Sequence, residues 1–537
     1  MATRTALHDK LVVSNKAALR TKYGAAGLKQ LNAALSALIA ADKKRGLKTR
    51  VVYLDDARSM KAIGAPVVTA AGSPRQNKSA IDGLYAKLAP DYLVLLGAPD
   101  VIPHQDVANP VYKPGDDDDQ WVFSDVPYAC NAGYSRDAAK FVGPTRVVTR
   151  LPDLTGATDV SFLLSLLTTA TGYTRRPHTD YASGFGLTAK VWKGSTSLSL
   201  FKLFGRGAAL NSSPTAGPVF SLAQLAPLAH FINCHGMPSD PTFYGQTGER
   251  YPEALTSKAV NRRIKPGTLA AVECCYGGEL YDSFALGLDL PICQNYLGQG
   301  AYAAMGSTTV AYGPATGNGV ADLICQYFLL AMFEGASVGR AGLEARQRFV
   351  QQAAQMDPVD LKTLMQFCVY GDASLHPVSM PATTEVPKSL EALAGLAGLA
   401  GNSSERYLRS ERRAGLESAG RFLSRYKPTA SQKSAQQAGA QVSAQLAAIL
   451  KATGLSTTHS GFVAFAVKAK SPAAGPATAS RGLAAMSVQS ADVSLRYHVN
   501  ICAASGQPEG QQRAGVAVVA KQIGNRIVDY RLYERHG

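Results

Sequence analysis

The sequence predicts an α/β protein with a largely parallel sheet covered by helices, followed by a smaller α+β appendage. Three observations predict it. Short apolar runs recur before Pro381, several of them end at or beside a glycine, and segments with helical spacing of apolar residues separate them. After Pro381 the composition changes, so the expected sheet ends before that residue.

The expected strands are the short apolar runs themselves. They lie at residues 50–54, 92–96, 231–234, 301–305 and 367–370. Strands that are buried on both faces have continuous rather than alternating apolar character, as these runs do. Residues 27–45, 159–170 and 319–333 are the expected helices between them. Sites in such sheets gather beyond the carboxyl ends of the strands.

The C-terminal region has a different amino-acid composition. Residues 388–452 are rich in alanine, include the repetitive LAGLAGLAG stretch and are predicted to form a linker and helices. Apolar residues then alternate from Val493 to Ile501. Residues 516–523 and 526–533 flank Gly524-Asn525, which predicts a two-residue hairpin turn.

A chain of 537 residues is too long for one core, so more than one domain is expected. We expect a basic helical segment at 1–44, an α/β subdomain at 45–180, a second α/β subdomain at 181–381, and a helical linker with a small β-containing domain at 382–537.

The formal charge of +16 is unevenly distributed. Residues 1–90 carry about +11 and residues 381–537 about +10, which leaves about −5 for the middle of the chain. The basic ends do not interleave aromatic residues with Lys and Arg, so nucleic acid is not the expected partner. A basic helix is predicted to be a solvated face, with an acidic protein partner as the alternative; it carries Arg406, Arg409, Arg412, Arg413 and Arg421.

The sequence also predicts a compartment. It contains no apolar run of membrane-spanning length, and charges interrupt its first residues where a signal peptide would be apolar. The eight cysteines are scattered, without the spacing of a disulfide framework or a zinc site. We therefore expect reduced thiols, a cytoplasmic location and no membrane partner.

Two segments carry the chemistry, LAHFINCHG at 228–236 and TLAAVECCYGG at 268–278. Each has the pattern of a buried strand that leads into a loop containing glycine. The first delivers His235 and the second delivers Cys275. A nucleophilic thiolate needs a neighbouring imidazole and backbone N–H groups that hold an oxyanion, and loops rich in glycine let such groups approach a substrate.

These segments resemble those of clan CD cysteine peptidases, which include caspases and metacaspases, and within the clan those of the gingipain-like family. The clan pattern is an apolar run before His-Gly, then about forty residues later a second run that ends in the cysteine. Further similar segments follow in the family's order across residues 45–380: YLVLLGAPDVIP at 92–103, SDVPY at 124–128, Arg-Leu-Pro at 150–152, GSTTVAYGP at 306–314 and YGDASL at 370–375.

The resemblance implies a caspase-like fold of two α/β subdomains, with the catalytic pair in the second. By that match Cys275 is the nucleophile, His235 the general acid/base, and the amides of Gly236 and Cys275 the oxyanion donors. The implied function is a cysteine endopeptidase that forms an acyl-enzyme intermediate with a protein or peptide substrate. The alternative is a catalytically silent caspase-like scaffold or a nucleic-acid-associated binding protein.

Other histidines and cysteines compete for these roles. Adjacent strand residues face opposite sides, so only one of Cys274 and Cys275 can face a cleft. Glu273-Cys274-Cys275 is similar to the acid-x-Cys arrangement of metacaspases, and this resemblance favours Cys275. His230 and Cys234 are expected to be packing residues. His104 is expected in a surface loop, with a place along the cleft as the alternative.

The sequence indicates the catalytic pair more directly than it indicates the substrate specificity or a metal site. Arg-specific gingipains place acids upstream of the His-Gly motif, but residues 181–239 of this chain contain none. The resemblance therefore does not imply a strict preference for Arg at P1 unless an acid such as Asp137, Asp180 or Asp240 arrives from elsewhere. A neutral or acidic P1 residue is the alternative. The candidate pocket residues are Lys193, Asp240 and Tyr312. The run 116–119, four aspartates, is expected to be a solvated loop, with calcium as the alternative; no other cofactor is predicted.

Overall fold

The computed structural model describes residues 8–314, 317–379, 402–434, 438–455, 461–468, 495–503 and 515–535. The predicted linker at 388–401 and the first alternating residue, Val493, lie outside these ranges. Across the described part of the chain, no helix is both long and apolar enough to cross a membrane.

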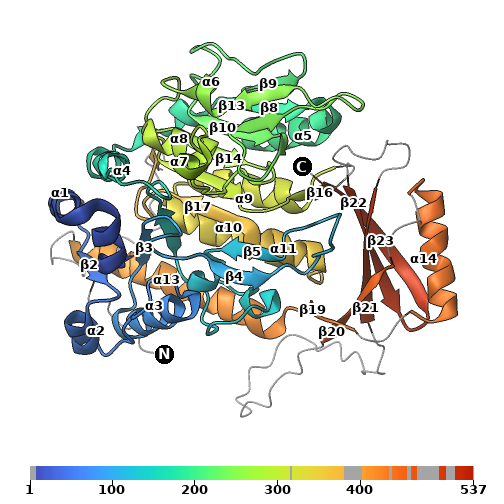
Figure 1. The fold of residues 1–537 in the computed structure, drawn as a ribbon, viewed down its shortest axis with the longest axis horizontal. Coiled ribbons are helices and arrows are strands. Elements are labelled where there is room, and N and C mark those ends of the chain that lie inside the picture. Colours follow the sequence, from blue (N-terminus) through green and yellow to red (C-terminus); the bar gives the residue numbers. More distant parts are fainter. Residues whose placement is uncertain are drawn as a thin grey trace, which may run out of the picture.

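A ten-stranded sheet forms the centre of the molecule (Figure 1). Its order is β2-β1-β3-β6-β17-β15-β14-β10-β8-β9. All neighbours pair in parallel except β15 and β17, which are antiparallel and join two parallel blocks. The strands are Thr49–Tyr53 (β2), Lys10–Ser14 (β1), Tyr92–Leu96 (β3), Val148–Leu151 (β6), Phe367–Tyr370 (β17), Ala303–Ser307 (β15), Leu269–Val272 (β14), Ala229–Asn233 (β10), Gly184–Ala189 (β8) and Ala208–Ser213 (β9).

Helices cover the sheet, and this confirms the predicted α/β class (Figure 1). The α-helices of this region are Lys16–Lys44 (α1), Ala57–Ile63 (α2), Pro74–Leu88 (α3), Ser161–Gly172 (α4), Lys193–Phe204 (α5), Ser257–Val260 (α6), Ser283–Leu286 (α7), Ile292–Gly298 (α8), Val320–Phe333 (α9), Val338–Gln352 (α10) and Pro358–Gln366 (α11). The short strands are Gln105–Ala108 (β4), Trp121–Ser124 (β5), Arg176–Pro177 (β7), His235–Gly236 (β11), Thr242–Tyr244 (β12), Glu253–Thr256 (β13) and Val378–Ser379 (β18).

The first 44 residues differ from the expected helical segment. Lys10–Ser14 form β1, which lies between β2 and β3 in the central sheet. The helix α1 begins at Lys16 rather than at residue 27, with non-helical backbone at Gly24. The run LVV is short and flanked by charges, so its apolar character alone did not distinguish a strand from a helix start. The predicted domain boundaries stay predictions.

A second sheet carries the C-terminal region and confirms the α+β appendage. Its strands pair in antiparallel fashion in the order β16-β23-β22-β21-β20-β19, and Gly524-Asn525 joins β22 to β23 as the predicted hairpin turn. Its elements are Asn402–Tyr426 (α13), Thr429–Lys433 (β19), Ala440–Ala452 (α14), Val463–Lys468 (β20), Leu495–Ala503 (β21), Gly515–Ile523 (β22), Arg526–Arg535 (β23) and, from the sequence segment after β15, Tyr312–Pro314 (β16).

Buried ion pairs link several segments of the family resemblance. The Arg150 guanidinium, fully buried at the end of β6, donates two hydrogen bonds of 2.6 and 2.8 Å to the Asp125 carboxylate. It also donates to the carbonyl groups of Gly97 and Ile102. The SDVPY and Arg-Leu-Pro segments therefore meet at one bidentate ion pair, which fixes their geometry.

Part of the basic helix α13 contacts acids of the same chain. The Arg413 guanidinium lies 3.0 Å from the Asp91 carboxylate, and that of Arg409 lies 3.8 Å from Asp9. These arginines dock α13 on the first parallel block. A contact with an acidic partner protein stays a prediction for Arg412 and Arg421, which are exposed, and the Arg406 side chain lies outside the described part of the chain.

Candidate functional site

The two predicted reactive residues lie at equivalent positions beyond neighbouring parallel strands. β10 and β14 pair with Ile232 opposite Val272, and the Glu273 N–H donates a 2.8 Å hydrogen bond to the Ile232 carbonyl. His235 and Cys275 each follow that matched pair by three residues. The shared register therefore brings both to the same carboxyl edge, where sites in parallel sheets form.

Close backbone packing confirms that the two loops touch. A Cβ atom at Gly236 would lie 2.0 Å from the Cys275 carbonyl oxygen and 3.0 Å from its carbonyl carbon. No side chain fits at that distance, so a glycine after His235 is a steric requirement of this contact.

The two adjacent cysteines face opposite sides of the sheet. The Cys274 sulfur accepts a hydrogen bond from the Cys234 N–H at 3.3 Å and joins the hydrophobic cluster that contains Ile232. Cys275 joins the cluster on the other face, and its sulfur accepts the Ala311 N–H at 3.0 Å. The arrangement is the one that strand alternation predicts.

The Cys275 thiol is fully buried, with 0% of the residue exposed. Burial raises its pKa to about 12, although the Arg535 guanidinium, the Ala311 N–H and the Lys362 ammonium act in the opposite direction. In this conformation the sulfur is therefore a protonated thiol, which is a poor nucleophile.

The residue after Cys275 has a strained backbone. Tyr276 has φ of +55°, in the left-handed region that bulky residues rarely adopt. Its N–H donates to the Thr309 carbonyl and its hydroxyl donates to Asp119 at 2.9 Å. These contacts hold a sharp turn directly after the cysteine, and strain of this kind is concentrated at functional sites.

The His235 ring sits in an aromatic enclosure. Its Nε2 lies 2.8 Å from the Gln246 side-chain oxygen. The Trp192 ring centroid is 4.4 Å away and the Tyr251 centroid 5.0 Å away. Trp192 ends the 3₁₀ helix Lys190–Trp192, which follows β8. These contacts hold the imidazole in one orientation, as a general acid/base requires.

The expected solvated loop at 116–119 is solvated only in part, because Asp118 is exposed but Asp117 is not. Asp117 is fully buried and accepts hydrogen bonds from the Tyr312 hydroxyl at 2.9 Å and the Lys362 ammonium at 2.5 Å. Asp119 accepts the Val310 N–H at 2.8 Å. The run therefore supports the segment that precedes β16. The Lys362 ammonium already neutralises Asp117, so this carboxylate has little attraction for a calcium ion.

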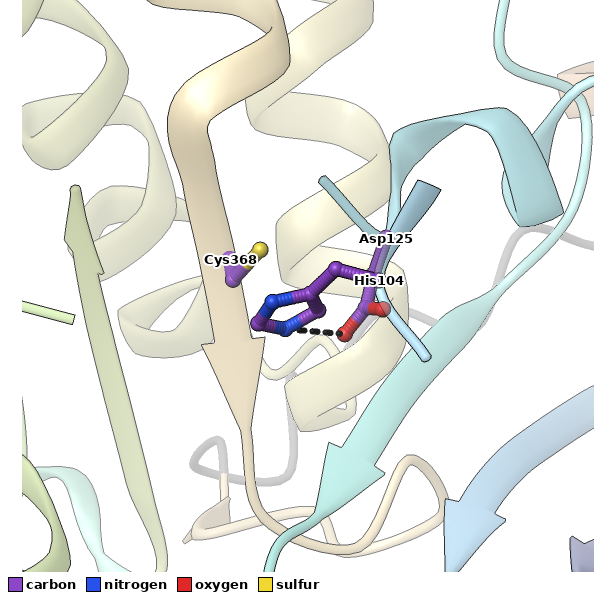
Figure 2. Close-up of side chains that lie close together, drawn as sticks. All are labelled: His104, Asp125 and Cys368. Carbon is purple, nitrogen blue, oxygen red and sulfur yellow. Dashed lines mark ion pairs between the residues drawn. The ribbon is translucent and has the colours of Figure 1, made fainter. Parts of the chain in front are cut away.

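His104 lies elsewhere and is buried rather than placed in a surface loop. Figure 2 shows its ring between Asp125 and Cys368 of β17, with the His104 Nε2 3.8 Å from the Asp125 carboxylate. The donor atoms of these three residues lie within 4.8 Å of one another. Burial lowers the pKa of His104 to about 4 and raises that of Cys368 to about 12, so both are neutral. Since Arg150 already pairs with Asp125, the cluster is a compensated ion pair with little attraction for a metal cation.

The other predicted residues are dispersed. Tyr312 lies in β16, one residue after the Ala311 that contacts the Cys275 sulfur. Lys193 is exposed at the start of α5. Asp240 accepts hydrogen bonds from the Thr242 N–H and the Tyr244 hydroxyl within its own turn.

The remaining polar candidates have local partners. Asp137 caps a 3₁₀ helix at Ala138–Phe141, and Asp180 lies 3.9 Å from Arg176. His230 contacts the Tyr296 hydroxyl and the Pro227 carbonyl, both at 2.9 Å, and burial lowers its pKa to about 4. These contacts support the expected packing role of His230.

Sequence reasoning missed several residues around the site. Trp192, Gln246 and Glu279 contact it through loops far apart in the sequence. Trp192 is one of only two tryptophans and directly precedes the predicted pocket residue Lys193, which was an available signal. Gln246 and Glu279 carry no local pattern that distinguishes them from surface polar residues.

Glu279 connects the loops that follow His235 and Cys275. Its carboxylate accepts the Ser239 N–H at 2.6 Å, and Ser239 has φ of +53°. Burial raises the pKa of Glu279 to about 7, with the Ser239 hydrogen bond opposing that effect.

Comparisons with known proteins give only distant likenesses. No protein-family model and no curated protein matches the chain. A solved protease structure aligns over 98% of this chain and 96% of its own, with 13% identity and a TM-score of 0.45. The Saccharomyces cerevisiae separase–securin complex aligns over 45% of this chain and 14% of that chain, with 12% identity and a TM-score of 0.26.

The contact between Gly236 and Cys275 makes a steric prediction. We expect Gly236→Ala to push the two loops apart and to destabilise the fold by roughly 1–3 kcal/mol, as overpacking does. Thermal denaturation measures the shift. Gly194→Ala is the matched control, because a Cβ there meets nothing within 4 Å. Equal melting temperatures for the two variants would contradict the contact.

The raised pKa of Glu279 predicts that the free energy of unfolding depends on pH. Below about pH 4.5 both the folded and unfolded states hold the proton, but between pH 4.5 and about 7 the unfolded state loses it first. Stability should therefore fall across this range, by on the order of 3 kcal/mol from this group. We expect Glu279→Gln to flatten the dependence of melting temperature on pH, while the exposed Glu253→Gln control follows the unsubstituted protein. A Glu279→Gln profile parallel to both would refute the assignment.

Proposed function

We propose that the chain is a cysteine peptidase of the gingipain-like family in clan CD, with Cys275 and His235 as its catalytic pair. The observation that carries the proposal is the shared register of β10 and β14, which brings His235-Gly236 against the backbone of Cys275. The structure contains the largely parallel, helix-covered sheet that this family would require. A cytoplasmic location stays a prediction.

Each residue has a role that follows from its chemistry. His235 takes the thiol proton of Cys275, and the thiolate attacks the carbonyl carbon of the scissile peptide bond. The N–H groups of Gly236 and Cys275 stabilise the oxyanion that develops. His235 then protonates the leaving amine, an acyl-enzyme remains, and water hydrolyses it with His235 as the base.

The environment supports this assignment of roles. Trp192, Tyr251 and Gln246 hold the imidazole, which limits the orientations from which it accepts a proton. The turn at Tyr276 directs the backbone sharply away after Cys275. Pre-organisation of this kind is what places catalytic groups accurately.

The P1 preference stays open between neutral and acidic residues on one side and arginine on the other. The predicted acids Asp137, Asp180 and Asp240 have local partners in the structure. Asp117 supplies a buried carboxylate near Tyr312, although Lys362 already pairs with it. A P1-varied fluorogenic panel measures the preference directly.

A second candidate is a catalytically silent scaffold with the same fold. The burial of the Cys275 thiol, whose pKa is about 12, favours it because an operating nucleophile must reach its substrate. Reaction of Cys275 with a peptidyl acyloxymethyl ketone probe would exclude this second candidate, since a silent scaffold leaves the probe unreacted.

Substitution of each of the two adjacent cysteines tests which of them is the nucleophile. We expect Cys275→Ala to abolish both peptide cleavage and probe labelling, whereas Cys274→Ala should keep most activity because its sulfur packs on the other face. Cleavage of a peptide library and labelling by the probe measure the two effects. Equal loss from both substitutions, in folded proteins, would rule out the assignment.

Substitution of each of the two histidines, His230 and His235, tests which of them is the general acid/base. We expect His235→Ala to lower turnover by about 100-fold or more, which is what general acid/base catalysis typically contributes. His230→Ala serves as the comparison and should lower stability more than turnover per folded molecule, since its ring is used in packing. A larger loss of turnover in folded His230→Ala would show that the motif is misassigned.

A further inference from the structure

The last described residues of the chain lie on the strand next to the catalytic cysteine. β23 pairs in antiparallel register with β16, with Arg535 opposite Tyr312 and Tyr533 opposite Pro314. β16 begins one residue after Ala311, whose N–H contacts the Cys275 sulfur. β16 and β23 lie side by side at the junction of the two sheets (Figure 1). A segment at the C-terminal end of the chain thus occupies a strand edge directly beside the thiol.

The same strand also contacts the histidine side of the site. The Trp192 indole N–H donates a 2.8 Å hydrogen bond to the Glu534 carboxylate. Trp192 packs against the His235 ring, with centroids 4.4 Å apart. Glu534 is therefore linked to the acid/base residue through a single side chain.

Arg535 reaches the cysteine side. Its guanidinium donates a 2.7 Å hydrogen bond to the Asp116 carbonyl. Its positive charge favours ionisation of Cys275, Tyr312 and Tyr276, which places it among the groups around the thiol. Glu534 and Arg535 together extend from the His235 side of the site to the Cys275 side.

We propose that β16 is the edge on which an extended peptide substrate pairs, and that β23 occupies this edge in the closed form of the protein and blocks access to Cys275. The inference rests on the proposed peptidase function and adds a regulatory contact to it. An extended peptide binds an open strand edge through main-chain hydrogen bonds, and β23 already makes this type of pairing with β16. A substrate that pairs on this edge of β16 must therefore displace the end of β23.

The two ends of this contact differ in how firmly they are held. Tyr533 is buried and its hydroxyl donates a 2.8 Å hydrogen bond to Asp357 at the start of α11. Beyond it, Glu534 and Arg535 are only partly buried. Opening therefore needs the release of the last residues of β23 rather than the unfolding of the C-terminal sheet.

The test weakens these last contacts in the full-length chain. The double variant Glu534→Ala/Arg535→Lys removes the Glu534 carboxylate and the Arg535 guanidinium but keeps a positive charge beside Cys275, and Asp529→Ala/Arg526→Lys makes the matched changes at the exposed start of the same strand. The first readout is the rate at which iodoacetamide alkylates Cys275, followed by mass spectrometry of its peptide. The second is kcat/KM on a fluorogenic peptide.

We expect at least about a tenfold increase in alkylation rate and in kcat/KM for Glu534→Ala/Arg535→Lys, and less than about a twofold change for the control. An unchanged alkylation rate in the folded double variant would overturn the inference, whatever its activity. Faster alkylation without peptide cleavage would support the block on Cys275 and contradict the proposed peptidase instead. A synthetic peptide of residues 526–535 should inhibit the opened variant, and failure to inhibit would count against β16 as the binding edge.

Discussion

The parallel pairing of β10 with β14 is the constraint on which the site depends. Because Ile232 lies opposite Val272, the residues that follow each strand advance together and bring His235-Gly236 against Cys275. The same alternation that buries Cys274 on one face sends Cys275 to the other. A shift of one residue would exchange the faces of every side chain that follows, so the register determines the chemistry.

The site is supported by charges that are neutralised within the fold. Lys362 pairs with Asp117, and that carboxylate accepts the Tyr312 hydroxyl, so the segment around β16 rests on a buried ion pair. Arg150 and Asp125 play a similar part in the other half of the sheet. Removing one member of such a pair would leave an uncompensated charge, which is far more costly than the pair is favourable.

Under the proposed function, the C-terminal sheet has two roles: it completes the fold, and its strand β23 blocks access to Cys275. Its edge strand β16 comes from the segment after β15, and β23 completes the pairing. A strand supplied by the same chain has a high effective concentration at its binding edge, so a peptide substrate must pair strongly with β16 to replace it. Under the proposed function, this competition accounts for a Cys275 thiol that is buried and protonated while the His235 ring is already oriented.

The sequence by itself determined the α/β class, most of the central strands, the C-terminal hairpin and the two loops that carry His235 and Cys275, because apolar periodicity and turn residues are local signals. Only the tertiary structure decided that β1 lies inside the sheet, that Asp117 is buried against Lys362, and that His104 packs beside Asp125. It alone placed Glu534 and Arg535 next to residues about 340 and 260 positions earlier. These contacts depend on how distant segments pack and neutralise one another's charge, which no local pattern records.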